Sequence, residues 1–171
     1  DQRLDSRIAA DLKEAFTMRD VPGNTGLLEL WPSAEFTRTA EVMFKTCLEG
    51  ANQVMEAFAI ALQLPTKFFR ENHLGENVAL RYLHYPVVDY VPDAEQMGAG
   101  AHTDFGTITL LFQDDVGGLE VQGADGIWRP APYIKDTIVV NTGDLMARWT
   151  NTEYRSTPHR VQPMNSDRHR Y

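Results

Sequence analysis

The chain has 171 residues, 43% of them hydrophobic and 23% charged, which is an ordinary globular composition with enough apolar side chains for one core. Asp and Glu number 24 against 16 Lys and Arg, so the formal net charge of -8 repels nucleic-acid phosphates and anionic lipid headgroups. Because no apolar run nears the ~20 residues of a membrane span, no signal-peptide layout is present and there is a single cysteine, we expect a cytoplasmic protein without nucleic-acid or membrane partners.

The first 77 residues carry helical patterns. Residues 6–20 begin with a good N-cap residue and repeat apolar residues at steps of three and four, which predicts an amphipathic helix. The same spacing runs from Ser33 to Leu64 and predicts a long helix with a buried stripe. Pro65 ends that helix, and a short helical turn is expected around "TKFFREN".

From residue 78 onward, short runs rich in Val, Ile, Leu, Thr and Tyr alternate with Gly, Pro and Asp clusters, which is typical of strands. A hairpin turn is expected at "GADGIW", and the lack of helical patterns between the runs favours an antiparallel sandwich or barrel. We expect a single domain over residues 1–171, with a helical support region at 1–77 and a β core at 78–171, incomplete at both ends. The candidate strands are "VALRYLHYP", "TITLLFQ", "GLEVQG", "TIVVNTG" and "YRSTPHRVQP".

The strongest chemical signal is the stretch "GAGAHTDFGTITLLFQDD" at residues 98–115. Side chains two residues apart on a strand or at its edge share a face, so His102 and Asp104 can hold one metal ion together. His159, in the last candidate strand, is the best third ligand, because two packed sheets can bring distant strands together. Two histidines and one carboxylate on one face of an octahedral Fe(II) leave three positions for other ligands. The four small residues before His102 would let backbone and ligand approach closely.

A simpler interpretation stays open, because a lone H-x-D pair is more often a surface or hydrogen-bonded pair than a metal site. Three other histidines are weaker candidates and are not chosen as ligands: His73 in a polar loop, His84 on a strand and His169 in a charged turn. In "VNTGD", Asn141 and Asp144 are expected to shape a turn rather than to contact substrate.

A cluster of cations closes the chain in "SDRHRY". If the Arg170 side chain points into the barrel mouth, its guanidinium needs an anion, and a substrate carboxylate held by two hydrogen bonds would supply one. A solvated loop cation is an equally open interpretation. Tyr85 in "LHYP" could donate to the same carboxylate or pack in the core, and Phe105 could line the substrate pocket or the core.

Taken together, "RYLHYP", "GAGAHTDFGTITLLFQDDVGGLEVQ", Trp128, "VVNTGD" and "WTNTEYRSTPHRV" resemble, in order and spacing, the Fe(II)/2-oxoglutarate-dependent dioxygenases of the isopenicillin-N-synthase-like family. The resemblance covers residues 78–171 closely and the helical half in layout. It implies a mainly β fold with flanking helices, a double-stranded β-helix (jelly roll, cupin-like) backed by the long helix of the N-terminal half. It also places iron ligands and 2-oxoglutarate contacts at five positions, namely His102, Asp104 and His159 for iron and Arg170 and Tyr85 for the cosubstrate.

The resemblance further implies an oxidoreductase of small-molecule or secondary metabolism that uses Fe(II), 2-oxoglutarate and O2. Oxidative decarboxylation of 2-oxoglutarate to succinate and CO2 would be coupled to hydroxylation, desaturation or cyclisation of a small organic substrate, with Phe105 as a substrate contact. Two alternatives stay open. One is a 2-oxoglutarate-independent Fe(II) oxidase of the same fold, and the other is a non-catalytic metal-binding jelly-roll protein.

Overall fold

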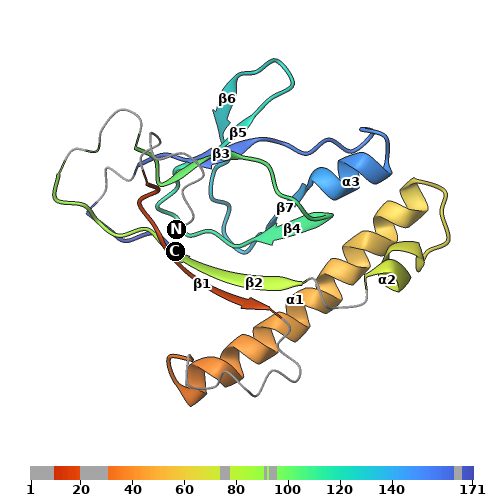
Figure 1. Cartoon of the computed structure of the whole chain (residues 1–171), viewed down its shortest axis with the longest axis horizontal. Coiled ribbons are helices and arrows are strands. Elements are labelled where there is room, and N and C mark those ends of the chain that lie inside the picture. Colours follow the sequence, from red (N-terminus) through yellow and green to blue (C-terminus); the bar gives the residue numbers. More distant parts are fainter. Residues whose placement is uncertain (1–9, 20–30, 74–77, 91, 93–95, 164–166) are drawn as a thin grey trace. The chain divides into compact units, whose positions relative to one another are not determined.

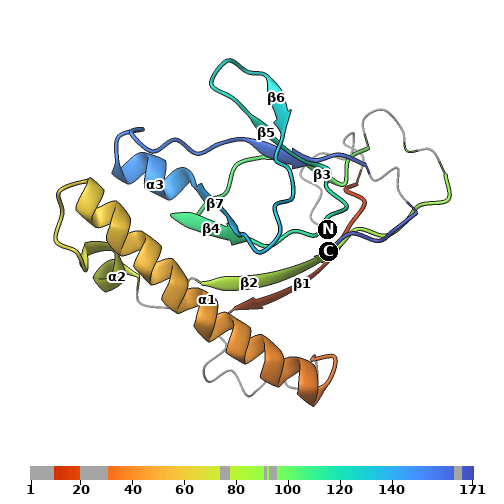
Figure 2. The same ribbon diagram turned by 180° about the vertical axis from the view of Figure 1, so that it is seen from behind.

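A computed structural model describes residues 10–19, 31–73, 78–90, 92, 96–163 and 167–171. The chain divides into two units, one of residues 1–15 and 82–171 and the other of residues 16–81. Figures 1 and 2 show, from opposite sides, that the short strands belong mostly to the first unit and that the long helix belongs to the second.

The unit of residues 16–81 is built around one long helix, α1 (Ala34–Ala61). Ser33 caps this helix, because its side-chain oxygen accepts a hydrogen bond from the Phe36 backbone N–H at 3.1 Å. A short helix, α2 (Phe68–Asn72), follows the loop that contains Pro65. Both helices confirm the expectation from the sequence. No helix among the described residues is long and apolar enough to cross a membrane. The buried stripe of α1 consists of Ala40, Phe44, Met55 and Ala59.

The helix expected over residues 6–20 is wrong in its described part. Residues 14–19 form a strand, β1 (Glu14–Arg19), which pairs with β2 (Ala79–His84) in a two-stranded sheet. Phe16 and Met18 turn their side chains to the more buried face of β1, so the apolar period here is two, and strand pairing overrides a helical spacing that the same residues also satisfy. Residues 1–9 of the expected helix lie outside the described residues.

The unit of residues 1–15 and 82–171 holds two antiparallel sheets (Figure 1), as expected. One sheet has four strands in the order β3-β8-β5-β6, and the other consists of β4 and β7. Each of the candidate strand segments from residue 107 onward contains one of these strands. The strands are β3 (Ala99–His102), β4 (Ile108–Leu111), β5 (Leu119–Gln122), β6 (Trp128–Pro130), β7 (Val139–Thr142) and β8 (His159–Val161).

The hairpin expected at "GADGIW" is confirmed between β5 and β6. The Gly123 N–H donates to the Ile127 carbonyl at 2.9 Å, and Gly126 has a φ of 76°, a backbone conformation that favours glycine. The expectation that no helix interrupts the strands is wrong, because α3 (Asp144–Trp149) follows β7 directly. Six residues are too few to reveal a helical period in the sequence.

The core of this unit contains Tyr85, Ala99, Leu119 and Val161. Gly98 packs so closely on this core that a Cβ atom there would lie 2.9 Å from the Gln162 carbonyl oxygen and 3.3 Å from Tyr85 Cδ1. At Gly98 the small residue therefore lets two protein segments approach, rather than protein and ligand as the sequence suggested.

Candidate metal centre

Two histidines come together through the register of two neighbouring strands. His102 ends β3 and His159 begins β8, and the two residues are opposite each other in the antiparallel pair. Their ring centroids are 4.4 Å apart. The sequence predicted that a distant strand would bring His159 to the H-x-D pair, and the structure confirms it within a single sheet rather than across two.

Backbone carbonyls fix the orientation of both imidazole rings. His102 Nδ1 lies 2.7 Å from the Gly100 carbonyl oxygen, and His159 Nδ1 lies 3.0 Å from that of Thr157. A carbonyl oxygen only accepts hydrogen bonds, so each Nδ1 must carry the proton. The Nε2 atom of each neutral ring is then left with its lone pair, which is the form that binds a metal ion.

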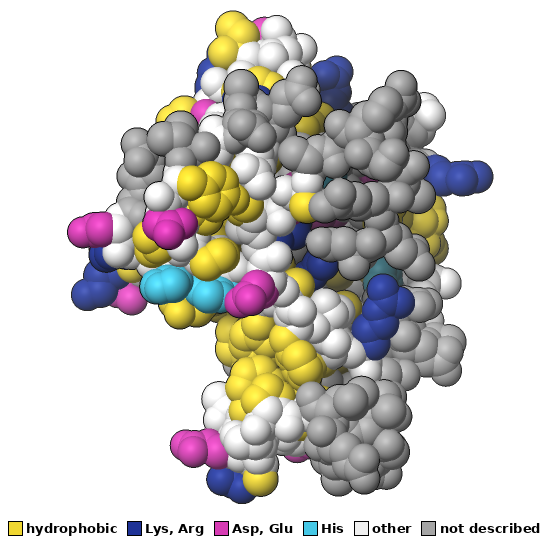
Figure 3. All heavy atoms as spheres, turned by 60° about the vertical axis from the view of Figure 1, so that its left-hand side comes forward, with side chains coloured by type: hydrophobic (Ala, Val, Ile, Leu, Met, Phe, Trp, Pro, Cys, Tyr) yellow, Lys and Arg dark blue, Asp and Glu magenta, His cyan; other side chains and the backbone are white. Residues whose placement is uncertain are grey.

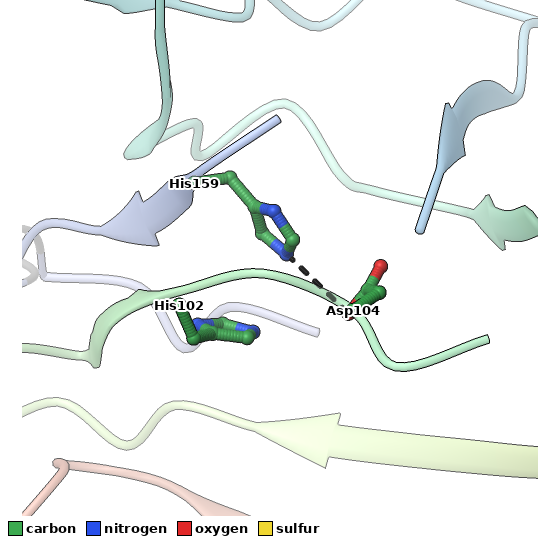
Figure 4. A group of neighbouring side chains, drawn as sticks. All are labelled: His102, Asp104 and His159. Carbon is green, nitrogen blue, oxygen red and sulfur yellow. Dashed lines mark ion pairs between the residues drawn. The ribbon is translucent and has the colours of Figure 1, made fainter. Parts of the chain in front are cut away.

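Asp104 supplies a carboxylate beside the two rings (Figure 4). It lies in the loop after β3 rather than on the strand itself, and its Oδ1 is 3.7 Å from His159 Nε2. One ligand atom from each of His102, Asp104 and His159, hereafter the triad, lies within 4.8 Å of the others. Within the described part of the chain, this is the one group of three or more such side chains close enough to hold an ion.

Hydrogen bonds keep the Asp104 carboxylate ionised. Burial raises its pKa, but hydrogen bonds from Asn141 and Thr109 and the nearby imidazoles of His159 and His102 together lower it below the ordinary value for aspartate. The carboxylate is therefore charged and ready to bind a cation at neutral pH and well into the acid range.

The segment "NTGDL" (residues 141–145) is hydrogen-bonded to the loop that carries Asp104. Backbone N–H groups of Gly143, Asp144 and Leu145 donate to the carbonyls of Thr107, Asp104 and Gly106 at 2.9, 2.7 and 3.1 Å. A Cβ atom at Gly143 would collide with the Gly106 carbonyl oxygen and lie 2.6 Å from that of Asp104. Only glycine fits this approach. The sequence expectation that Asn141 shapes a turn is wrong, because Asn141 lies on β7 and its amide reaches Asp104.

Arg170 and Tyr85 form a second pair in the same unit. Their backbones make an antiparallel bridge, with N–H to carbonyl distances of 2.8 and 3.1 Å. Arg170 is only 3% exposed, its guanidinium carbon lies 4.6 Å from the centre of the Tyr85 ring, and its Nε donates to the Gly117 carbonyl at 2.7 Å. Arg170 is thus a buried cation and not a solvated loop residue, while its binding of 2-oxoglutarate stays a prediction.

His84, His169 and Phe105 make none of the hydrogen bonds given above for the triad. His84 bonds to Glu14 Oε2 through Nδ1 at 2.7 Å and to His169 Nδ1 through Nε2 at 2.9 Å. Histidine side chains accordingly gather beside acidic ones on the surface shown in Figure 3. Phe105 is 90% exposed, and its contact with substrate stays a prediction.

The triad fits a transition-metal ion of the Fe(II) type. Two imidazole nitrogens and one carboxylate oxygen are the ligands that such ions take in non-haem oxygenases, with the remaining positions left for other molecules. A second set of partners behind the ligands, here the Gly100 and Thr157 carbonyls, is also the usual arrangement at histidine metal sites. Two histidines on one antiparallel strand pair and a carboxylate in the adjoining loop define the chain as a largely β protein with a candidate site for one metal ion.

Comparison with known proteins gives the family. Residues 75–171 match the 2OG-Fe(II) oxygenase superfamily, and the chain belongs to it. It is 42% identical over 142 residues to the 2-oxoglutarate-dependent dioxygenase citB of Monascus ruber, covering 80% of this chain and 43% of that protein. It is 39% identical over 160 residues to the proline hydroxylase buaE of Petromyces alliaceus, covering 88% of this chain and 50% of that protein.

A solved structure confirms the double-stranded β-helix class of fold. A full-length Neurospora crassa protein, crystallised in complex with alpha-KG, superposes with a TM-score of 0.85 at 36% identity, over 100% of this chain and 56% of that one. The chain therefore spans about half the length of the relatives that it matches.

Proposed function

We propose that this chain is the core of an Fe(II)/2-oxoglutarate-dependent dioxygenase. The reaction couples oxidative decarboxylation of 2-oxoglutarate to succinate and CO2 with hydroxylation, desaturation or cyclisation of a small organic substrate. The observation that carries the proposal is the triad, in which one ligand atom from each side chain lies within 4.8 Å of the others and both rings are held through Nδ1 by backbone carbonyls. The named activities of the dioxygenase citB and the proline hydroxylase buaE support it.

In this proposal the triad holds Fe(II) from one side, with one atom each from His102, Asp104 and His159. Three ligand atoms from the protein would leave other positions on the ion for 2-oxoglutarate and O2. Bound iron supplies the activation of O2, and the protein supplies the geometry, the ionised carboxylate and the placement of the reactants. Residues 1–171 act as one oxygenase domain in this scheme, with the cytoplasm as the compartment that suits the free thiol of Cys47.

Arg170 binds the second carboxylate of 2-oxoglutarate in the same proposal. Among the described residues, no carboxylate forms an ion pair with its buried guanidinium. A buried cation without an anionic partner is unfavourable, so a ligand carboxylate at this position restores the charge balance. The Tyr85 ring packs over the guanidinium carbon and keeps the side chain in place.

The test is anaerobic addition of Fe(II) and then 2-oxoglutarate, read by visible absorption. The expected result is a metal-to-ligand charge-transfer band in the wild type and none in His102→Ala. Iron binding without a band would favour the 2-oxoglutarate-independent oxidase instead. Failure of the wild type to bind iron would overturn the enzyme proposal.

A further inference from the structure

We propose that Thr109 and Asn141 are positioning residues that force Asp104 to bind the metal through one oxygen, Oδ1. The inference rests on the proposed iron site and adds to it two residues that never touch the ion. Their function is to occupy the other oxygen, Oδ2, so that the carboxylate cannot chelate with both oxygens and take a position that 2-oxoglutarate needs.

The first argument is that both donors bind the same oxygen. The Thr109 hydroxyl donates to Asp104 Oδ2 at 2.7 Å, and the Asn141 side-chain amide donates to it at 2.8 Å. Two short hydrogen bonds use both lone pairs of that oxygen. Oδ1 is the oxygen that faces His159 Nε2, at 3.7 Å. The two ends of one carboxylate thus have separate partners, one end for the protein and one for the ion.

The second argument is that the donors come as a preformed pair. Thr109 on β4 and Asn141 on β7 are directly opposite each other in the antiparallel register, so their side chains are neighbours on one face of that sheet. The backbone bonds from Gly143, Asp144 and Leu145 hold the loop around Asp104 against the end of β7. The imidazoles are therefore fixed by the β3–β8 pair, and the carboxylate is fixed by the β4–β7 pair.

The chemical consequence follows from counting positions on an octahedral ion. With a one-oxygen carboxylate, the triad uses three positions and leaves three for a two-point cosubstrate and O2. If the carboxylate chelates, four positions are used, and the cosubstrate and O2 compete for two. Loss of either donor should therefore alter the coordination geometry and reduce cosubstrate affinity. Separately, loss of a hydrogen-bond partner that orients a metal ligand should weaken metal binding.

The experiment uses Co(II) as a spectroscopic probe of the intact protein, with Thr109→Val and Asn141→Leu as variants of nearly unchanged size. Each is expected to lower Co(II) affinity by about 10- to 100-fold, the usual effect of losing a partner of a metal ligand. Each should also change the visible Co(II) spectrum, which reports coordination number. Thermal unfolding of the metal-free variants checks that both are folded at the temperature of the titration. Thr109→Ser keeps the hydroxyl and should restore the wild-type affinity and spectrum.

A matched control is Thr142→Val. It removes a hydroxyl from the residue after Asn141 on the same strand, but that hydroxyl donates to the Arg155 carbonyl at 2.7 Å and not to Asp104. Its Co(II) affinity and spectrum should equal those of the wild type. Wild-type spectra in Thr109→Val and Asn141→Leu, or an equal change in Thr142→Val, would overturn the positioning role alone. If the wild type and His102→Ala bind Co(II) equally, the proposed iron site fails and takes this inference with it.

Discussion

The unit of residues 1–15 and 82–171 contains two groups that each combine two histidines with one carboxylate. The triad has both Nδ1 atoms hydrogen-bonded to backbone carbonyls, which leaves each Nε2 with a lone pair in the neutral form of the ring. The outer histidine group, Glu14, His84 and His169, has two histidines and an acidic residue as well, but His84 uses both of its nitrogens on the other two members. The two groups therefore contain similar residues, but in the outer histidine group both ring nitrogens of His84 already have partners.

From this contrast we expect hydrogen-bond partners, and not residue types alone, to decide which cluster can bind a metal ion. In the triad the backbone carbonyls accept hydrogen bonds from the two Nδ1 atoms, so the ligand atoms of the side chains are left to face one another. In the outer histidine group the side chains satisfy one another, and a metal ion would first have to break a 2.9 Å contact between His84 and His169. Paired variants test this contrast, starting with the largest expected effect.

Replacement of one histidine from each group gives the sharpest test. His159→Ala removes a direct ligand and should lower Fe(II) affinity by more than about 100-fold, beyond the usual effect of losing an outer partner. His84→Ala should leave Fe(II) affinity unchanged, because neither of its ring nitrogens is free. Anaerobic metal titration measures both. Equal losses in the two variants would show that the outer histidine group takes part in binding.

The second-largest effect is expected at Arg170. This residue follows His169 of the outer histidine group in the sequence, but its side chain is buried. Arg170→Gln should lower 2-oxoglutarate affinity by about 30-fold or more, because truncating one partner of a buried charge pair costs ~2–5 kcal/mol. The control is Arg168→Gln, an exposed residue whose guanidinium lies 3.1 Å from Asp115. Titration of the charge-transfer band gives both affinities. Similar affinities for the two variants would remove Arg170 from the cosubstrate site.

The backbone hydrogen bonds between Gly143 and the loop of Asp104 predict an effect on stability that is smaller than the expected effects on affinity. Gly143→Ala forces a methyl group against two carbonyl oxygens and should cost ~1–3 kcal/mol of unfolding free energy. Gly106→Ala adds the same methyl group on the loop that carries Asp104, where nothing lies within 4 Å of the new atom, and should have little effect. Urea unfolding of the two variants measures the difference. If they unfold at the same urea concentration, the close approach at Gly143 is not a constraint.

Glu120 should give the smallest effect and a pH signature. Hydrogen bonds from Gln162 and Arg160, which flank the end of β8, lower the pKa of this carboxyl. A lowered folded-state pKa stabilises the protein above the ordinary glutamate value, and the contribution is lost as pH falls through the folded-state pKa. Glu120→Gln should therefore be less stable than the wild type at pH 7, by under about 1 kcal/mol. The two proteins should converge in strong acid, and a constant difference in urea midpoint would contradict this account.

The sequence predicted those parts of the molecule that depend on local pattern. The long helix follows from regular spacing between Ser33 and Leu64, and the triad from the H-x-D pair, the later His159 and the family resemblance. β3 was missed because "AGAH" has no β-branched or aliphatic residue larger than alanine. The pattern around the first strand predicts a helix because Phe16 and Met18 fit both the helical and the strand period, and only the pairing with β2 selects the strand.

The support around Asp104 lay beyond sequence reasoning for a different reason. Asn141 is 37 residues from Asp104, and the pair meets only because β4 and β7 align Thr109 with Asn141. Register between distant strands is a property of the folded sheet, and no local pattern reports it. The sequence "NTGD" can be recognised as a motif, but its contact with the loop of Asp104 cannot be predicted from it.

The carbonyl partners of the two imidazoles give the metal site an uneven tolerance of sequence change over evolutionary time. Any residue that preserves the backbone at Gly100 or Thr157 still offers a carbonyl oxygen, so substitution at those positions leaves the hydrogen bonds to the two Nδ1 atoms intact. The aspartate instead depends on two side chains, and one base change can delete either donor. A single substitution can thus change the hydrogen bonding of the carboxylate, whereas substitutions at Gly100 or Thr157 leave the acceptors of the two imidazoles in place.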